Sequence, residues 1–171
     1  MAACQPRDGR RSGSGGRGEP CRAPARRRAA TLNAYLDTSV LVALLTEDAL
    51  SERADALLQR HDPAVMVSDL ARAEFASVMA LRVRTQRMDE SAAREAFAKL
   101  DAWVAAAALP AKLENGDVLL AERFLRRLDM TLRTQDAMHI ALALRLGASL
   151  ATFDARMAGS ARGLGAVVLE G

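Results

Sequence analysis

The chain has 171 residues, half of them apolar, and a net charge of +3. This length suits one domain with a single hydrophobic core. Its apolar runs fall short of the roughly 18–20 residues needed to cross a bilayer, so the sequence predicts no membrane span.

Residues 1–30 differ in composition from the rest of the chain. They hold eight Arg against two acids, a net charge of +6, which leaves −3 of the total of +3 for residues 31–171. Because the tail is rich in Arg, Gly and Pro and has no apolar periodicity, we predict that it is disordered. It is a neutral extension, a translation start assigned too far upstream, or a basic arm that adds salt-sensitive affinity for RNA. The predicted domain is residues 31–171.

Both cysteines, Cys4 and Cys21, lie in this tail. The predicted domain therefore has no disulfide framework and no cysteine ligands for zinc. This agrees with a reducing compartment, and we expect a cytoplasmic protein.

Predicted strands and helices alternate after the tail. Strands are expected at 31–37, 64–68, 148–153 and 166–170, and helices at 39–48, 51–60, 70–87, 89–108, 117–128, 135–146 and 155–164. Thr38 or Ser39 is expected to cap the first helix. Pro110 is expected to stop the helix at 89–108. Thr134 is expected to cap the helix that ends at Gly147. Near-continuously apolar strands in this order predict an α/β fold with a parallel sheet covered on both faces.

Four acidic residues are the main candidates for a site. Asp37 and Asp154 end apolar strands, Asp136 lies in the first turn of a helix, and Glu74 lies on a helix face. Sites in parallel sheets lie outside the carboxyl ends of the strands, so we expect these side chains to gather there. Gathered carboxylates repel one another unless a cation lies among them, and a hard divalent ion is the obvious candidate. Taken singly, each has a structural explanation as a helix cap or as the partner of a base such as Arg72.

Hydroxyl and basic groups accompany these acids. Thr38 and Ser39 follow the first acid, and Thr152 precedes the last by two residues. These hydroxyls orient a carboxylate or a water molecule in the predicted site, or else they only cap helices and fill a strand. Arg133 and Arg156 flank two of the acids and are the candidates for binding RNA phosphates, the alternative being a solvated basic face.

His139 lies one turn after Asp136 on the same predicted helix. A single His in an apolar helix is more often a hydrogen-bonded structural group than a ligand, and we predict that role. A body without cysteine and without a His pair does not predict zinc.

Together these segments resemble a known family. The stretches "YLDTSVLVALL", "LRTQDAMHIALAL" and "ASLATFDARMAGSARGLG" look like the motif regions of PIN-domain ribonucleases of the bacterial VapC toxin type, over residues 32–169. The resemblance implies a three-layer α/β/α fold with a central parallel sheet. It places Asp37, Glu74, Asp136 and Asp154 in the acidic quartet of the family, with Asp37 and Asp136 as the most direct metal ligands.

The resemblance also implies an activity and partners. It implies Mg²⁺- or Mn²⁺-dependent hydrolysis of RNA by the toxin of a toxin–antitoxin pair. Attack by a metal-activated water would leave a 5′-phosphate and a 3′-hydroxyl. The implied partners are a cognate VapB-like antitoxin and a second copy of the chain in a homodimer.

Two other functional hypotheses compete with a ribonuclease. The same fold could serve as a non-catalytic module that binds a metal or a basic peptide. Alternatively, Asp37 could be the nucleophile of a phosphotransfer enzyme. The dehalogenase type of such enzymes needs a second Asp two residues after the first, where this chain has Ser39.

Overall fold

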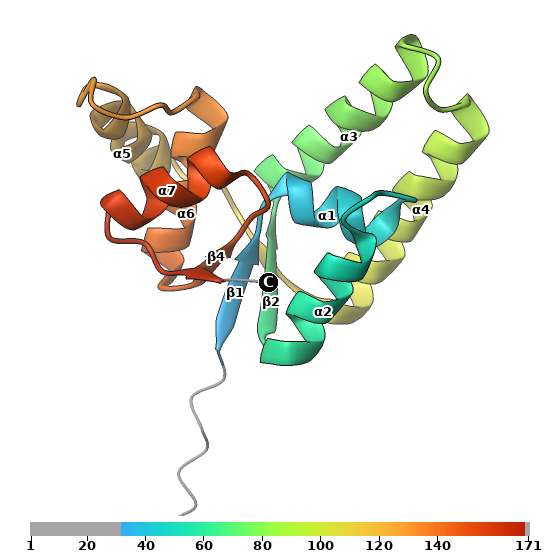
Figure 1. Cartoon of the computed structure of the whole chain (residues 1–171), viewed down its shortest axis with the longest axis horizontal. Coiled ribbons are helices and arrows are strands. Elements are labelled where there is room, and N and C mark those ends of the chain that lie inside the picture. The colour runs from blue at the N-terminus through green and yellow to red at the C-terminus, as the bar shows by residue number, and fades with distance from the viewer. Residues whose placement is uncertain (1–31, 170–171) are drawn as a thin grey trace, which may run out of the picture.

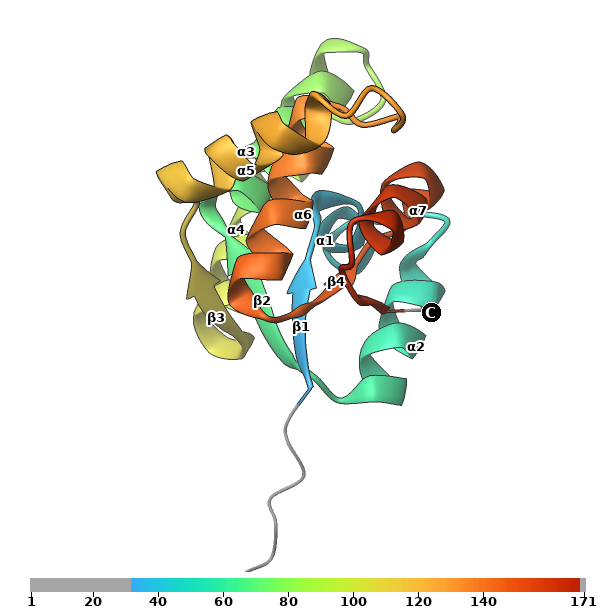
Figure 2. The same ribbon diagram turned by 90° about the vertical axis from the view of Figure 1, so that its left-hand side faces the viewer.

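The computed structural model describes residues 32–169, so the predicted tail, residues 1–30, lies outside the described residues. A five-stranded, all-parallel sheet with strand order β3-β2-β1-β4-β5 forms the centre (Figures 1 and 2). The strands are β1 (Asn33–Leu36), β2 (Ala64–Ser68), β3 (Ala108–Ala111), β4 (Ser149–Ala151) and β5 (Val168–Leu169). The helices are α1 (Thr38–Leu45), α2 (Ser51–His61), α3 (Asp69–Arg84), α4 (Glu90–Ala107), α5 (Asn115–Leu125), α6 (Thr134–Leu146) and α7 (Ala155–Gly163).

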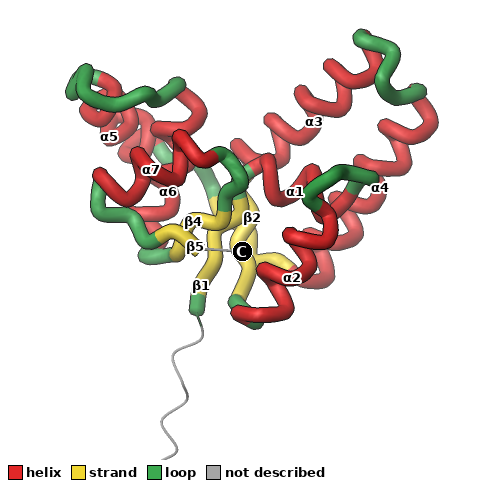
Figure 3. The backbone as a smooth tube through the Cα atoms, viewed as in Figure 1, coloured by secondary structure: helices red, strands yellow, loops and turns green. Residues whose placement is uncertain are grey.

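Helices cover both faces of this sheet. α1 to α4 lie on one side, whereas α6 and α7 lie on the other, with α5 packed against α6 (Figures 1 and 3). The predicted α/β class and the three-layer arrangement implied by the family resemblance are therefore confirmed.

The alternation of side chains along β1 explains the two layers. Successive residues of a strand point to opposite faces of a sheet. Ala34 and Leu36 join the core beneath α1 to α4, which also contains Phe75. Tyr35 points the other way and joins the core beneath α6, which contains Ile140. All three β1 side chains are fully buried, as expected for the central strand of a parallel sheet.

The carboxyl ends of β1 and β4 lie side by side at the centre of the sheet. The backbone N–H of Asp37, just after β1, donates to the carbonyl of Ala151 at the end of β4 (3.1 Å). From there the chain enters α1 and α7, so that helix starts and strand ends meet at one edge. α3 and α4 form a helical hairpin that extends beyond this edge (Figures 1 and 3).

The structure adds one strand, β3, to those predicted. The sequence pattern assigns Pro110 only the role of stopping a helix, but this residue lies within β3, opposite Val67 of β2. Proline lacks a backbone N–H and is tolerated in sheets at an edge, and β3 is an edge strand. The chain also passes from α4 into β3 without a loop, so no turn residues mark the boundary.

The predicted N-caps of two helices are wrong by one or two residues. Asp37, rather than Thr38 or Ser39, is the N-cap of α1 and accepts a hydrogen bond from the backbone N–H of Val40. A carboxylate ending a strand is free to turn back toward the exposed amides of the next helix, which is what an N-cap does.

At α6 the N-cap position belongs to Arg133, and Thr134 is the first helical residue. The side chain of Asp136 accepts from the backbone N–H of Arg133 (3.1 Å), so the acid satisfies an amide at the helix start that a hydroxyl cap would leave unpaired. The predicted end of this helix is confirmed, because Gly147 adopts a left-handed conformation with φ of 60°.

Candidate functional site

The four predicted acids line one pocket at the carboxyl edge of the sheet. The pocket has a volume of about 500 Å³ and is formed by the starts of α1, α6 and α7 and by one side of α3. Its lining includes all four carboxylates together with a few polar and apolar neighbours: Asp37, Thr38, Ser39, Val42, Asp48, Leu50, Glu74, Ser77, Val78, Arg133, Gln135, Asp136, His139, Asp154 and Met157. The structure therefore brings together four acids that are up to 117 positions apart in the chain.

Asp37 is the buried member of this group, with 4% of its surface exposed. One carboxylate oxygen accepts from the Ser39 hydroxyl (2.7 Å) and from the Val40 N–H (3.1 Å), and the other accepts from the Thr152 hydroxyl (2.8 Å). Burial raises the pKa of Asp37, although these hydrogen bonds oppose the shift. Within residues 32–169 no Lys or Arg forms an ion pair with it.

Glu74 reaches the same pocket from α3 and is half-buried. Its Oε2 accepts from the Thr38 hydroxyl (2.7 Å) and lies 2.6 Å from His139 Nε2. Burial alone would raise the pKa of Glu74, but the hydrogen bonds from His139 and Thr38 outweigh it and lower the pKa. The alternative partner, Arg72, instead pairs with Asp101 (2.7 Å).

Asp136 and Asp154 both lie at helix starts and are half-buried. Asp136 uses one oxygen to accept from the backbone N–H of Arg133. Asp154 uses one oxygen to accept from the backbone N–H groups of Arg156 (2.8 Å) and Met157 (3.1 Å). In the described part of the chain the second oxygen of each carboxylate has no hydrogen-bond donor, so both retain an atom with which to bind a ligand.

The three predicted hydroxyls all contact acids of the site. Ser39 and Thr152 each donate to Asp37, and Thr38 donates to Glu74. The Thr152 hydroxyl also accepts from the backbone N–H of Asp154 (3.0 Å). Hydroxyl donors fix the orientation of these carboxylates and add no positive charge of their own.

The two predicted phosphate-binding arginines lie in different places. Arg133 lines the pocket next to Asp136. Arg156 is exposed at the start of α7 and is not among the residues that line the pocket. Of these two arginines, Arg133 alone lines the pocket that contains the acids.

His139 and Tyr35 extend the site, although the sequence analysis proposes neither of them as a site residue. His139 was predicted as a hydrogen-bonded structural residue, and it is buried, with 3% exposed. It is bonded on one side to Glu74 and on the other to the Tyr35 hydroxyl (2.6 Å). Burial raises the pKa of Tyr35, so its phenol stays protonated. The one signal in the sequence is the spacing of three residues between Asp136 and His139, which places both on one helix face.

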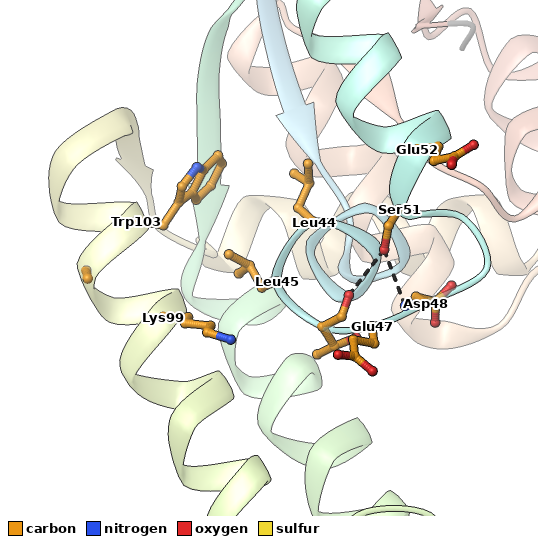
Figure 4. A pocket seen from close by; sticks show the side chains of 10 residues that line it. Leu44, Leu45, Glu47, Asp48, Ser51, Glu52, Lys99 and Trp103 are labelled. Atoms are coloured by element: carbon orange, nitrogen blue, oxygen red, sulfur yellow. Dashed lines mark hydrogen bonds between the residues drawn. The ribbon is translucent and has the colours of Figure 1, made fainter.

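A larger pocket, of about 970 Å³, lies on the far side of α1 between α2 and α4 (Figure 4). Leu44, Leu45 and Trp103 form its apolar part, while Glu47 and Lys99 reach its rim. It contains none of the four predicted acids, so size alone does not locate the chemistry of this protein.

The donor set of the smaller pocket suits a hard divalent cation. Its charged ligands are carboxylates, and oxygen ligands are those that Mg²⁺ prefers. Among residues 32–169 no three His, Cys, Asp or Glu side chains are close enough to form a complete ligand cage. Mg²⁺ does not require one, because it commonly keeps several waters and binds through one or two carboxylates and substrate phosphates.

The family model described as "PIN domain" matches residues 34–162, which include all four acids, β4 and all of β1 except Asn33. The chain belongs to the PIN-domain family. The ribonuclease VapC46 of Mycobacterium tuberculosis is 33% identical over 138 residues, which are 79% of this chain and 95% of that protein. This PIN domain is therefore of the VapC type, as the motif regions predicted.

Solved structures agree with this assignment of the fold. The crystal structure of the sarcin–ricin loop cleaving toxin VapC20 of Mycobacterium tuberculosis is similar, with a TM-score of 0.62 and 22% identity, over 81% of this chain and 99% of that one. VapBC-1 of nontypeable Haemophilus influenzae is similar with a TM-score of 0.60 and 13% identity, over 81% and 98%. None of the helices in residues 32–169 of this PIN domain combines the length and apolarity needed to traverse a membrane.

Proposed function

We propose that this PIN domain is a metal-dependent endoribonuclease, the toxin of a toxin–antitoxin pair, which hydrolyses RNA phosphodiester bonds. The observation that carries the proposal is the buried Asp37 carboxylate. It shares a pocket with three other acids and is held by hydroxyls and one backbone N–H instead of a basic side chain. Such a group is costly to bury unless a cation is bound beside it.

We propose Asp37, Glu74, Asp136 and Asp154 as the residues that hold Mg²⁺ or Mn²⁺. The bound ion supplies the positive charge that makes water nucleophilic near neutral pH and that stabilises charge on the phosphate. The free oxygens of Glu74 and Asp154 are available to orient the attacking water by accepting its proton in a hydrogen bond. Hydrolysis by water leaves a 5′-phosphate and a 3′-hydroxyl.

Contacts with the RNA are proposed for two arginines. Arg133, which lines the pocket, is the candidate for a phosphate next to the cleaved bond. Arg156 is exposed outside it and would reach only a more distant phosphate of the same strand. The two residues should therefore differ in effect, with loss of Arg133 costing more activity than loss of Arg156.

A VapB-like antitoxin and homodimer formation are the proposed protein interactions. VapBC-1 of Haemophilus influenzae, which shares this fold, is by its name a complex of VapB with VapC. The larger pocket offers a surface for such a partner, because Leu44, Leu45 and Trp103 are apolar and surrounded by charged side chains. A partner helix with an apolar stripe is the usual occupant of a groove of this kind.

A non-catalytic module of the same fold is the alternative. The two readings differ in what Asp37→Asn does, since a catalyst loses turnover and a binding module has none to lose. We expect the antitoxin-free full-length protein to cut total RNA at discrete positions with Mg²⁺ or Mn²⁺ and not with EDTA. Asp37→Asn should lower the rate by at least about 100-fold, the upper range for losing a partner in a metal site.

The matched control is Asp55→Asn, an exposed carboxylate on α2 outside the pocket, which should cut like the wild type. Cut ends are mapped with a ligation that requires a 5′-phosphate. Ends that carry a 2′,3′-cyclic phosphate would contradict hydrolysis by water, because they show attack by the ribose hydroxyl. A folded wild-type protein that binds metal and cuts no RNA would favour the binding module.

A further inference from the structure

A continuous chain of hydrogen bonds lies beneath Glu74. Its Oε2 is 2.6 Å from His139 Nε2, and His139 Nδ1 is 2.6 Å from the Tyr35 hydroxyl. The Tyr35 hydroxyl is in turn 2.7 Å from the Ser68 hydroxyl. This series of hydrogen bonds joins the pocket to the interior through residues of α3, α6, β1 and β2.

Donor and acceptor chemistry fixes the direction of the bond that matters. Glu74 is a carboxylate, which only accepts hydrogen bonds. Thr38 already donates to Oε2, so the contact with His139 requires an Nε2–H donor. This holds for the neutral ring with its proton on Nε2 and for the charged ring alike.

The imidazole has little freedom to turn away from Glu74. His139 is 3% exposed and Tyr35 is fully buried. Their rings lie 5.7 Å apart between centroids, and Tyr35 is packed in the same core as Ile140. Tyr35 is itself fixed by β1, so the second nitrogen of the imidazole is held by the central strand of the sheet.

Both donors to Glu74 use the same oxygen. Thr38 and His139 bond to Oε2, and in residues 32–169 no donor is bonded to Oε1. The carboxylate is therefore held in one orientation while one oxygen stays available for a ligand in the pocket. Groups that orient a metal-binding carboxylate in this way tune both affinity and activity.

We propose that His139 is a positioning residue for Glu74, and that Tyr35 holds the imidazole of His139 in place for this task. The proposal rests on the proposed function, because the orientation of Glu74 matters only if the pocket binds a cation and RNA. In this role His139 acts through Glu74, to which it is hydrogen-bonded.

Three variants remove different hydrogen bonds between Glu74, His139 and Tyr35. His139→Leu removes both hydrogen bonds, whereas His139→Gln keeps an amide donor near the position of Nε2. Tyr35→Phe removes only the hydroxyl that holds the ring. The matched control is Ile140→Val, a fully buried neighbour on α6 that packs in the same core as Tyr35 and whose apolar side chain cannot hydrogen-bond to Glu74.

Two readouts on the full-length protein separate positioning from folding. One is binding of Mn²⁺ in the absence of RNA, measured from the electron paramagnetic resonance signal of free Mn²⁺. The other is the division of any loss of cleavage between kcat and KM, with the RNA that the wild type cuts. Melting temperatures are recorded for every variant.

We expect His139→Leu to weaken Mn²⁺ binding and lower kcat by about 10- to 100-fold each, with KM for RNA little changed. His139→Gln should recover most of the loss, and Tyr35→Phe should fall between. Ile140→Val should lower the melting temperature while keeping Mn²⁺ affinity and kcat.

Three outcomes would overturn the proposal. The first is a folded His139→Leu with wild-type Mn²⁺ affinity and kcat. The second is a loss in every variant, Ile140→Val included, that follows the melting temperature. The third is a wild type that neither binds Mn²⁺ nor cuts RNA, which would refute the proposed function and the positioning role with it. Wild-type cleavage with an unaffected His139→Leu would refute the positioning role alone.

Discussion

Two buried carboxylates of this molecule, Asp37 and Asp117, have opposite surroundings. Asp117 is 1% exposed, and its two oxygens accept from the guanidinium of Arg145 at 2.7 and 2.9 Å. The hydrogen bond with Asp117 also raises the pKa of Arg145. Asp37 is 4% exposed and has only hydroxyls and a backbone amide as donors among residues 32–169.

The difference separates a structural carboxylate, Asp117, from the carboxylate that we propose as a cation ligand, Asp37. Asp117 lies at the start of α5, Arg145 lies at the end of α6, and their ion pair joins two helices that pack along each other. Arg145 supplies the positive charge at Asp117, so this carboxylate needs no external cation. At Asp37 the hydrogen-bond donors are two hydroxyls and a backbone amide, with no Lys or Arg of residues 32–169 paired to it, which is why we propose an external cation there.

Asp117→Asn should give the largest change in stability. Breaking a buried ion pair leaves an uncompensated charge and costs about 3–5 kcal/mol, and partial exposure of Arg145 favours the lower end. Urea denaturation measures the change, with Asp101→Asn as control because its pair with Arg72 is exposed and worth less than about 1 kcal/mol. Cleavage per folded molecule should not change. If Asp117→Asn and Asp101→Asn lowered the free energy of unfolding equally, the structural role of Asp117 would be refuted.

Mg²⁺ should stabilise the protein only through the site of Asp37. A ligand that binds the folded state alone adds about 2.7 kcal/mol at 100 times its dissociation constant. The melting temperature of the wild type and of Asp117→Asn should therefore rise with Mg²⁺ and return with EDTA. That of Asp37→Asn should stay nearly constant. A similar rise in all three proteins would place the ion elsewhere.

The pH dependence of stability should show the cost of burying Asp37. Its pKa is raised in the folded state, so the folded protein holds this proton more tightly than the unfolded chain does. Stability contributed by this group is then lost as pH rises from the ordinary Asp value of about 3.9 through the raised value.

Asp37→Asn has no such titration. In metal-free buffer at pH 8 it should be more stable than the wild type by about 0.5–2 kcal/mol, the usual gain from relieving a functional constraint. The gain should shrink as the pH approaches 4, which urea titrations at the two pH values measure. A variant that is less stable at both would show that the charge of Asp37 is already balanced.

Features that depend on a few neighbouring residues can be predicted from the sequence alone. Strand and helix patterns follow from periodicity over a few residues, and they predicted the parallel α/β fold. The four acids were recognised because each stands at a strand end or near a helix start, positions that a parallel sheet brings to one edge.

Features that depend on distant pairs were not predictable from one sequence. The bond between Tyr35 and His139 spans 104 positions and that between Glu74 and His139 spans 65, with no local pattern to mark either. The partner of Asp117 is 28 positions away, so this acid resembles any helix-start residue until Arg145 is seen beside it. The short strand with Pro110 was missed because it is recognised by its place at the sheet edge.

The separation of these residues along the chain also sets an order in time. Asp37 is bonded to Thr152, 115 positions later, and β1 pairs with β4, which is among the last elements to be synthesised. A ribosome that has made the first hundred residues has made Asp37 and Glu74 but neither α6 nor β4. The four acids therefore gather only when the domain is nearly complete, and an unfinished chain carries no assembled acidic pocket beside the ribosome that is making it.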